Sequence, residues 1–138
     1  MRGQSPIFEQ VMLFVLGVAI FIICFSMFKI YEDYFTDITV RDQLDAAKNF
    51  IISNILKLSK RSGDINSSIM LKIPRKAVNQ PYQVSLSSKG INVTSLASGM
   101  YSDSGLYNLS KSFELEGSTL SSYGKCIIYK KGNKIIIE

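Results

Sequence analysis

The chain has 138 residues, of which 46% are hydrophobic and 20% charged, and its formal net charge is +5. A chain of this length forms at most one modest globular domain beside a membrane segment. It contains no His and only two Cys, which removes the commonest general base and the usual ligands of a zinc site. We therefore expect a protein that is not an enzyme, with no catalytic residues, no metal site and no cofactor.

The positive charge is scattered along the sequence. Its densest groups, Arg75-Lys76 and Lys130-Lys131, each adjoin a Pro or a Gly that indicates a turn. No aromatic and basic pattern typical of RNA-binding domains accompanies them. We expect a solvated basic surface and no nucleic-acid partner.

The uncharged segment between Glu9 and Lys29 has the length of a membrane span. Residues 10–28 are almost all apolar, and about twenty helical residues cross a ~30 Å hydrocarbon core. The alternative is a buried core helix, but such a helix in a small domain is hydrophobic on one stripe, and this segment is hydrophobic on every side. We therefore expect a transmembrane helix in contact with membrane lipid.

The flanking charges predict its orientation. Arg2 and the α-amine precede the span, whereas the acids Glu32, Asp33 and Asp37 follow Lys29. The positive-inside rule then places the N-terminus in the cytoplasm and the C-terminal domain outside the cell. The apolar segment is too long for an ordinary secretory signal and lacks a small-residue cleavage site at its far end, so we expect it to remain attached.

The most specific motif lies before the span. Arg2 and Gly3 precede Gln4, and Glu9 is the only acid ahead of the apolar segment. This pattern resembles the class III signal peptide (type IV prepilin-like) of archaeal pilin-like and archaellin-like surface proteins. The resemblance implies a prepilin peptidase that removes residues 1–3 by cutting after Gly3, leaving Gln4 as the first residue. It also implies that Glu9 serves assembly by pairing with the α-amine of a neighbouring subunit.

Residues 31–62 continue the helical pattern as an extension of the span, which we place at residues 4–30. Apolar residues recur there at intervals of three or four positions, which predicts one stripe of an amphipathic helix. The stripe consists of Val40, Leu44, Ala47, Ile51, Ile55 and Leu58. Ser62-Gly63-Asp64 is a plausible stop signal.

Residues 63–138 have the composition of an external β domain. Short strands are predicted at residues 65–73, 82–88, 91–96, 113–115, 125–130 and 134–138. Ser88-Lys89-Gly90 and Lys131-Gly132-Asn133 indicate hairpin turns, and residues 97–123, rich in Ser, Gly and Tyr, are expected to form long loops.

A sheet this small needs the amphipathic helix to complete a core. The predicted fold class is therefore α+β: a long N-terminal helix, whose membrane span continues into an amphipathic half, packed on a small antiparallel β-sheet domain. This layout is similar to that of type IV pilin-like subunits.

Three sequons, beginning at Asn66, Asn92 and Asn108, all lie in the domain predicted to be external, and they are candidates for glycosylation. Cys24 falls in the span and Cys126 in a predicted strand, so we expect no disulfide between them. Glu114 and Glu116 are expected to be surface charges without a companion.

Two functions remain open from the sequence. In the first, the chain is a major or minor pilin-like subunit that partners with itself or other pilin-like subunits and assembles into or caps a cell-surface filament. In the second, it is an unprocessed single-pass membrane protein whose external β domain binds an envelope component. The first predicts a location in the cell membrane before assembly and in an extracellular filament afterwards.

Overall fold

The structure, a computed structural model, describes residues 5–60 and 66–138. The chain divides into two compact units, Met1–Asp37 and Ile38–Glu138, and each is described by itself. One helix, α1 (Ser5–Ser59), contains all the described residues of the first unit and is also the first element of the second. Its sequence has no Pro after Pro6 and a single Gly, so nothing interrupts the hydrogen-bond ladder.

In the second unit, α1 buries the apolar stripe expected from the sequence. The exposed fraction of all six stripe side chains is between 0% and 8%. Positions between them, such as Ser53 and Lys57, remain exposed. The predicted amphipathic pattern is therefore confirmed, and it decides which face of the helix meets the sheet.

Seven strands follow α1. They are β1 (Ser67–Lys72), β2 (Tyr82–Ser87), β3 (Gly90–Ser95), β4 (Tyr101–Gly105), β5 (Glu114–Leu120), β6 (Lys125–Lys131) and β7 (Lys134–Ile137). Six of the seven overlap predicted strands. The two predicted hairpins are also confirmed, because β2 pairs with β3 and β6 pairs with β7, both antiparallel.

The expectation of long loops over residues 97–123 was wrong. The structure places there β4, a short helix α2 (Tyr107–Ser110), all of β5 and a 3-10 turn (Ser121–Tyr123). Leu106 and Leu109 bury their side chains in the core, and Ser102 is 7% exposed. Isolated apolar residues among Ser and Gly give no periodic signal, so only packing against α1 and the sheet reveals their burial.

The strands form one sheet in the order β1-β6-β7-β5-β2-β3-β4. The predicted all-antiparallel sheet needs one correction, because β5 and β7 are parallel neighbours, with Leu115 opposite Ile135. β6 follows β5 in the sequence but does not pair with it. Instead β6 forms an antiparallel hairpin with β7, and β7 lies between β6 and β5 in the sheet. The fold is α+β, as expected.

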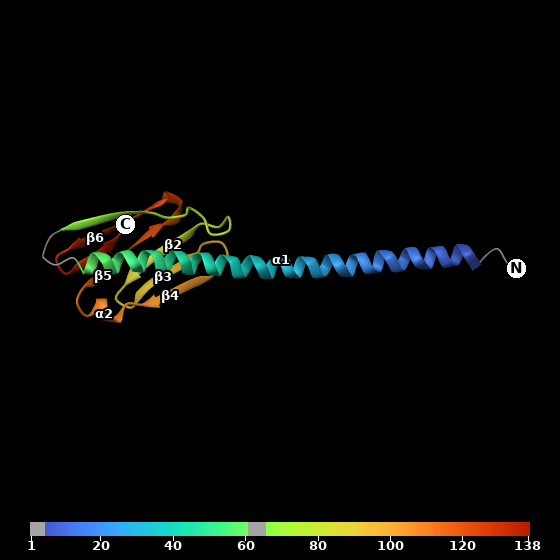
Figure 1. The fold of residues 1–138 in the computed structure, drawn as a ribbon, viewed down its shortest axis with the longest axis horizontal. Helices are drawn as coiled ribbons and strands as arrows, with labels where there is room; N and C mark the ends of the chain where they lie inside the picture. The colour runs from blue at the N-terminus through green and yellow to red at the C-terminus, as the bar shows by residue number, and fades with distance from the viewer. Residues whose placement is uncertain (1–4, 61–65) are drawn as a thin grey trace. The chain divides into compact units, whose positions relative to one another are not determined.

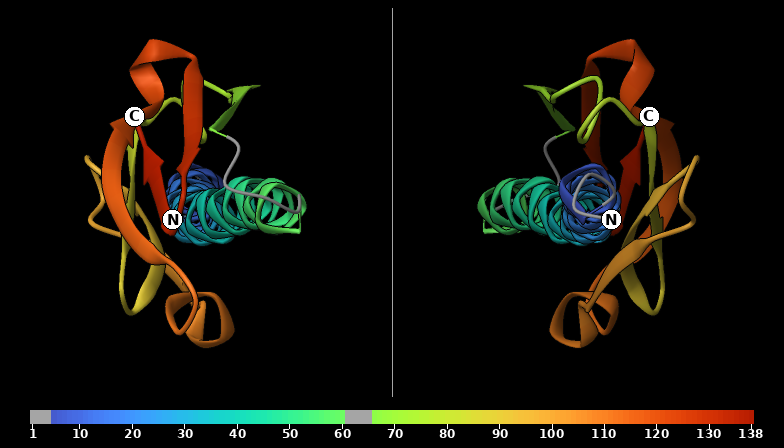
Figure 2. Two further views of the ribbon diagram at one scale, coloured as in Figure 1. Left: turned by 90° about the vertical axis from the view of Figure 1, so that its left-hand side faces the viewer. Right: turned by 90° about the vertical axis from the view of Figure 1, so that its right-hand side faces the viewer.

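One face of the sheet packs on the second-unit part of α1. Figure 1 shows this part, coloured green, lying along the strands, and Figure 2 shows the strands as an arc on one side of it. Side chains alternate between buried and more exposed positions along β2 and β6. The resulting core joins the α1 stripe to Tyr82, Val84, Ile128 and Ile137.

Candidate functional site

The apolar surface of the first unit is the most unusual chemical feature of the chain. Large apolar side chains from Ile7 to Phe35 are exposed, with fractions from 43% at Val18 to 73% at Phe14. Among the described residues, α1 is the one helix long and apolar enough to cross a membrane, and its most apolar window has a mean hydropathy of 2.9. A surface of this kind is stable only where lipid or other protein covers it.

The Ser26 hydroxyl within this segment is satisfied inside the helix. Ser26 lies among apolar residues, and its Oγ donates a hydrogen bond of 2.8 Å to the carbonyl oxygen of Ile22. Such bonding to the preceding turn removes the need for water. The Ser26 side chain is therefore compatible with a hydrocarbon environment.

Charges mark both ends of that length. Glu9 is exposed at one end. At the other, Lys29 Nζ lies 3.0 Å from Glu32 Oε2 and 3.9 Å from Asp33 Oδ1. These pairs are solvent-exposed, so each contributes little to stability. Their position one turn beyond the apolar segment is typical of the boundary between membrane and water.

Aromatic side chains gather at the same boundary. Tyr31, Tyr34 and Phe35 are 56%, 62% and 62% exposed, and Tyr34 and Phe35 follow Tyr31 on α1 by three and four positions. The rings of Tyr34 and Phe35 are 6.2 Å apart in an edge-to-face arrangement. Aromatic residues are enriched at membrane interfaces, where one end is apolar and the other wet. We call residues 31–37 the aromatic-acidic segment, because Glu32, Asp33 and Asp37 lie among these rings.

The residues of the expected cleavage site, Arg2, Gly3 and Gln4, lie outside the described residues. The three sequon asparagines are all exposed. Asn66 precedes β1, Asn92 lies within β3 and Asn108 lies in α2. The Asn92 Oδ1 accepts a hydrogen bond of 3.2 Å from Thr94 Oγ1 of the same sequon.

A polar cluster attaches β4 to α1 and was not predicted. Lys48 Nζ donates to Ser102 Oγ at 2.7 Å and to Asp45 Oδ1 at 2.9 Å. Ser102 Oγ also donates a hydrogen bond to Asp45 Oδ1. The hydrogen bond from Ser102, followed by that from Lys48, holds the pKa of Asp45 below its ordinary value. The cluster therefore keeps Asp45 ionised, and Lys48 pairs with a carboxylate as a cation.

Asp45 and Lys48 stand three positions apart, so sequence reasoning can pair them, but no sequence signal links either to Ser102. Ser102 is buried, and its hydroxyl accepts a hydrogen bond from Lys48 while donating one to the Asp45 carboxylate. Within residues 5–60 and 66–138, no group of three His, Cys, Asp or Glu could hold a metal ion.

Burial rather than charge governs two other titratable groups. It raises the pKa of the Cys126 thiol to about 11 and that of the Tyr82 hydroxyl to about 12. Tyr82 Oη donates a hydrogen bond of 2.7 Å to the carbonyl oxygen of Pro74. Cys24 and Cys126 are both free. Tyr82 and Cys126 belong to the core, and their raised pKa values keep both groups neutral near neutral pH.

Glu116 is an exposed surface charge, as expected, and it has an ion-pair partner. Its Oε1 lies 2.7 Å from Lys134 Nζ on the neighbouring strand β7. This hydrogen bond raises the pKa of Lys134. Because more than half of the Glu116 side chain is exposed, the pair is a surface interaction rather than a site.

No protein-family model, curated protein or solved structure matches this chain. Its function must therefore be argued from the site itself.

Proposed function

We propose that the chain is a type IV pilin-like subunit, major or minor, that inserts in the membrane and then assembles into or caps a cell-surface filament. The observation that carries the proposal is that the two parts of α1 differ in the exposure of their apolar side chains. Its first part exposes apolar side chains on every side, whereas its continuation is committed to the core of a β domain. Such a molecule has an apolar helix surface that needs a covering of lipid or protein, and a β domain whose core is already formed.

Assembly would replace lipid by the same helix of neighbouring subunits. Helices in apolar surroundings associate through close packing, because lipid already satisfies their hydrophobicity. A side-chain Cβ added at Gly17 would meet nothing within 4 Å, so a neighbouring backbone can approach there. The proposed function is packing and display rather than catalysis.

Glu9 would provide the specificity of assembly. A carboxylate that enters an apolar environment needs a cationic partner. Cleavage after Gly3 by a prepilin peptidase would create an α-amine at Gln4, close to Glu9 in sequence, and the amine of one subunit could pair with Glu9 of the next. This step rests on the resemblance of the first nine residues to class III signal peptides.

Intact mass and N-terminal peptide analysis of the chain from its native membrane test the proposal. We expect a chain that begins at Gln4. Gly3→Leu should remain uncut and unassembled, whereas Glu9→Gln should be cut and inserted but fail to assemble. Asp42→Asn, which neutralises an exposed acid of α1 beyond the apolar segment, is the matched control and should assemble normally. Filaments formed by both Gly3→Leu and Glu9→Gln would contradict the proposal.

A second candidate is a permanent single-pass anchor that carries the β domain to an envelope component. The aromatic-acidic segment favours it, because Tyr side chains at the interface are typical of helices that stay in a membrane. In that case the mature chain keeps Arg2 and Gly3, and replacement of residues 10–28 by an unrelated apolar helix is harmless. The same replacement should abolish filaments if the first proposal holds.

In both candidates the β domain lies outside the cell with its three sequons accessible. Mass analysis of the same sample reports on glycosylation at Asn66, Asn92 and Asn108, and single Asn→Gln variants assign each site.

A further inference from the structure

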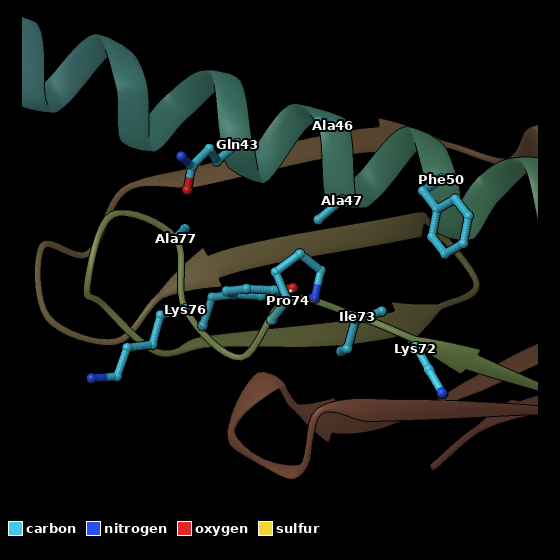
Figure 3. A pocket seen from close by; sticks show the side chains of 10 residues that line it. Gln43, Ala46, Ala47, Phe50, Lys72, Ile73, Pro74, Lys76 and Ala77 are labelled. Carbon is cyan, nitrogen blue, oxygen red and sulfur yellow. Dashed lines mark hydrogen bonds between the residues drawn. The ribbon is translucent and has the colours of Figure 1, made fainter.

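The second unit contains an open apolar groove between α1 and the segment that joins β1 to β2. Its volume is about 350 Å³, within the range typical of ligand pockets. Figure 3 shows Ala47 and Phe50 of α1 facing Ile73 and Pro74 across it. Ala46 and Phe50 are exposed on the helix side, and Ile73 and Ala77 form a buried floor.

The rim of this groove is positively charged. Lys72 and Lys76 line it. Lys125 stands directly opposite Lys72 in the pairing of β1 with β6. Arg75 packs near Gly124, since a Cβ there would lie 3.0 Å from Arg75 Nε. None of these four cations forms an ion pair within the described part of the chain.

The aromatic-acidic segment has the opposite properties. Residues 31–37 carry three acids and no base. Their exposed rings belong to Tyr31, Tyr34 and Phe35. Glu32 and Asp33 form ion pairs with Lys29, and these pairs are exposed. Because solvent screens them, exchanging Lys29 for another cationic partner costs little free energy.

We propose that the groove binds the aromatic-acidic segment of a second copy of this chain. Rings from that segment would fill the apolar floor while its acids meet Lys72 and Lys76. The argument is charge complementarity around a matching apolar centre, an arrangement that gives specificity at interfaces. The inference deepens the proposed function and rests on it for the meeting of two copies.

An acidic peptide of another protein or a lipid chain would satisfy only part of the pattern, and both are outcomes of the test below.

Cross-linking between differently tagged copies tests the contact. One copy carries Tyr31→Cys, which leaves Tyr34 and Phe35 in place, and the other carries Ala46→Cys, both in a Cys24→Ser background. The full chains are co-expressed in native membranes and treated with a short bismaleimide. The control pair joins Tyr31→Cys to Ser118→Cys, an exposed position on β5 away from the groove. We expect about fivefold more heterotypic product from the groove pair than from the control.

Charge reversal tests the rim. Lys72→Glu with Lys76→Glu should lower the cross-linked fraction about tenfold, because the acids then face like charges. Lys89→Glu with Lys111→Glu makes the same net change at two exposed positions that do not line the groove and should leave the product unchanged. Equal product from all variants overturns the proposal. If the cysteine of Ala46→Cys is then still protected from labelling by a maleimide, the result points to an apolar occupant of the groove such as lipid.

Filament formation, scored in the same cells, separates the two proposals. Filaments without the groove cross-link would support the proposed function and reject the groove contact. The cross-link without filaments would support a pairwise contact in the membrane and reject filament assembly. The chain can also be diluted to one copy per nanodisc. If the cysteine of Ala46→Cys is still protected from maleimide labelling there, the occupant of the groove is another partner, and the second copy is rejected.

Discussion

Lys48 and Ser102 are joined by a hydrogen bond of 2.7 Å although 54 residues separate them in the sequence. Lys48 lies on α1 and Ser102 on the edge strand β4, and Lys48 also donates to the carbonyl oxygen of Asp103 at 3.3 Å. The bond therefore attaches the last strand of the sheet to the helix by polar contacts, in addition to the apolar core.

Removal of the Ser102 hydroxyl tests this attachment. Ser102→Ala removes the hydrogen bonds that the hydroxyl makes to Asp45 and Lys48, although these two residues still bond to each other, so we expect a loss of about 1–2 kcal/mol in the free energy of unfolding. Urea unfolding of the full chain in detergent micelles, followed by far-UV circular dichroism, measures it. Ser118→Ala, on an exposed position of β5, should change it by less than about 0.5 kcal/mol.

The same cluster predicts an acid-dependent stability. The pKa of Asp45 is lower in the folded protein than its ordinary value of 3.8, so its stabilisation is present above that value and disappears as pH falls through the folded pKa. Asp45→Asn should therefore lose less stability than the natural chain between about pH 5 and pH 2. Asp42→Asn, which changes an exposed acid nearby, should follow the natural chain. Denaturant midpoints across this pH range decide, and parallel curves for Asp45→Asn and the natural chain would refute the assignment.

The buried stripe of α1 predicts a contrast between neighbouring faces of one helix. Ile51 is 0% exposed, whereas Leu56 is 40% exposed. Ile51→Ala should lower the free energy of unfolding by about 2–5 kcal/mol, because it leaves a cavity between helix and sheet. Leu56→Ala should cost much less, since little of its contact area is lost. Thermal unfolding monitored by near-UV circular dichroism compares them, and equal costs would contradict the packing.

Gly117 predicts a backbone effect in the centre of the sheet. Its φ is +115°, and a Cβ would lie 2.2 Å from the carbonyl oxygen of Ile137. Gly117→Ala must therefore move β5 away from β7, and we expect a loss of about 2–4 kcal/mol. Gly132→Ala is the matched control, because Gly132 also has a positive φ of +55° but no atom within 4 Å. It should cost only about 1–2 kcal/mol, the strain of that conformation alone. Melting temperatures of the two variants separate steric contact from backbone strain.

Much of the fold follows from periodicity in the sequence. The α1 stripe from Val40 to Leu58 has helical spacing over a long segment, and the alternation in Tyr82–Ser87 identifies a strand with one buried face. The hairpins after Ser87 and Lys131 follow from turn residues between adjacent strands. These signals are local, so a single sequence is sufficient to detect them.

The candidate site divides in the same way. The sequence alone determined the exposed apolar segment, the charges that bound it and the fold class, because hydrophobicity and charge order are properties of neighbouring residues. Only the tertiary structure decided that Ser102 meets Lys48, that β5 lies parallel to β7, and that Lys72 and Lys76 border an apolar groove beside Phe50. These relationships join segments tens of residues apart, and their energies depend on the burial and the distances that packing creates.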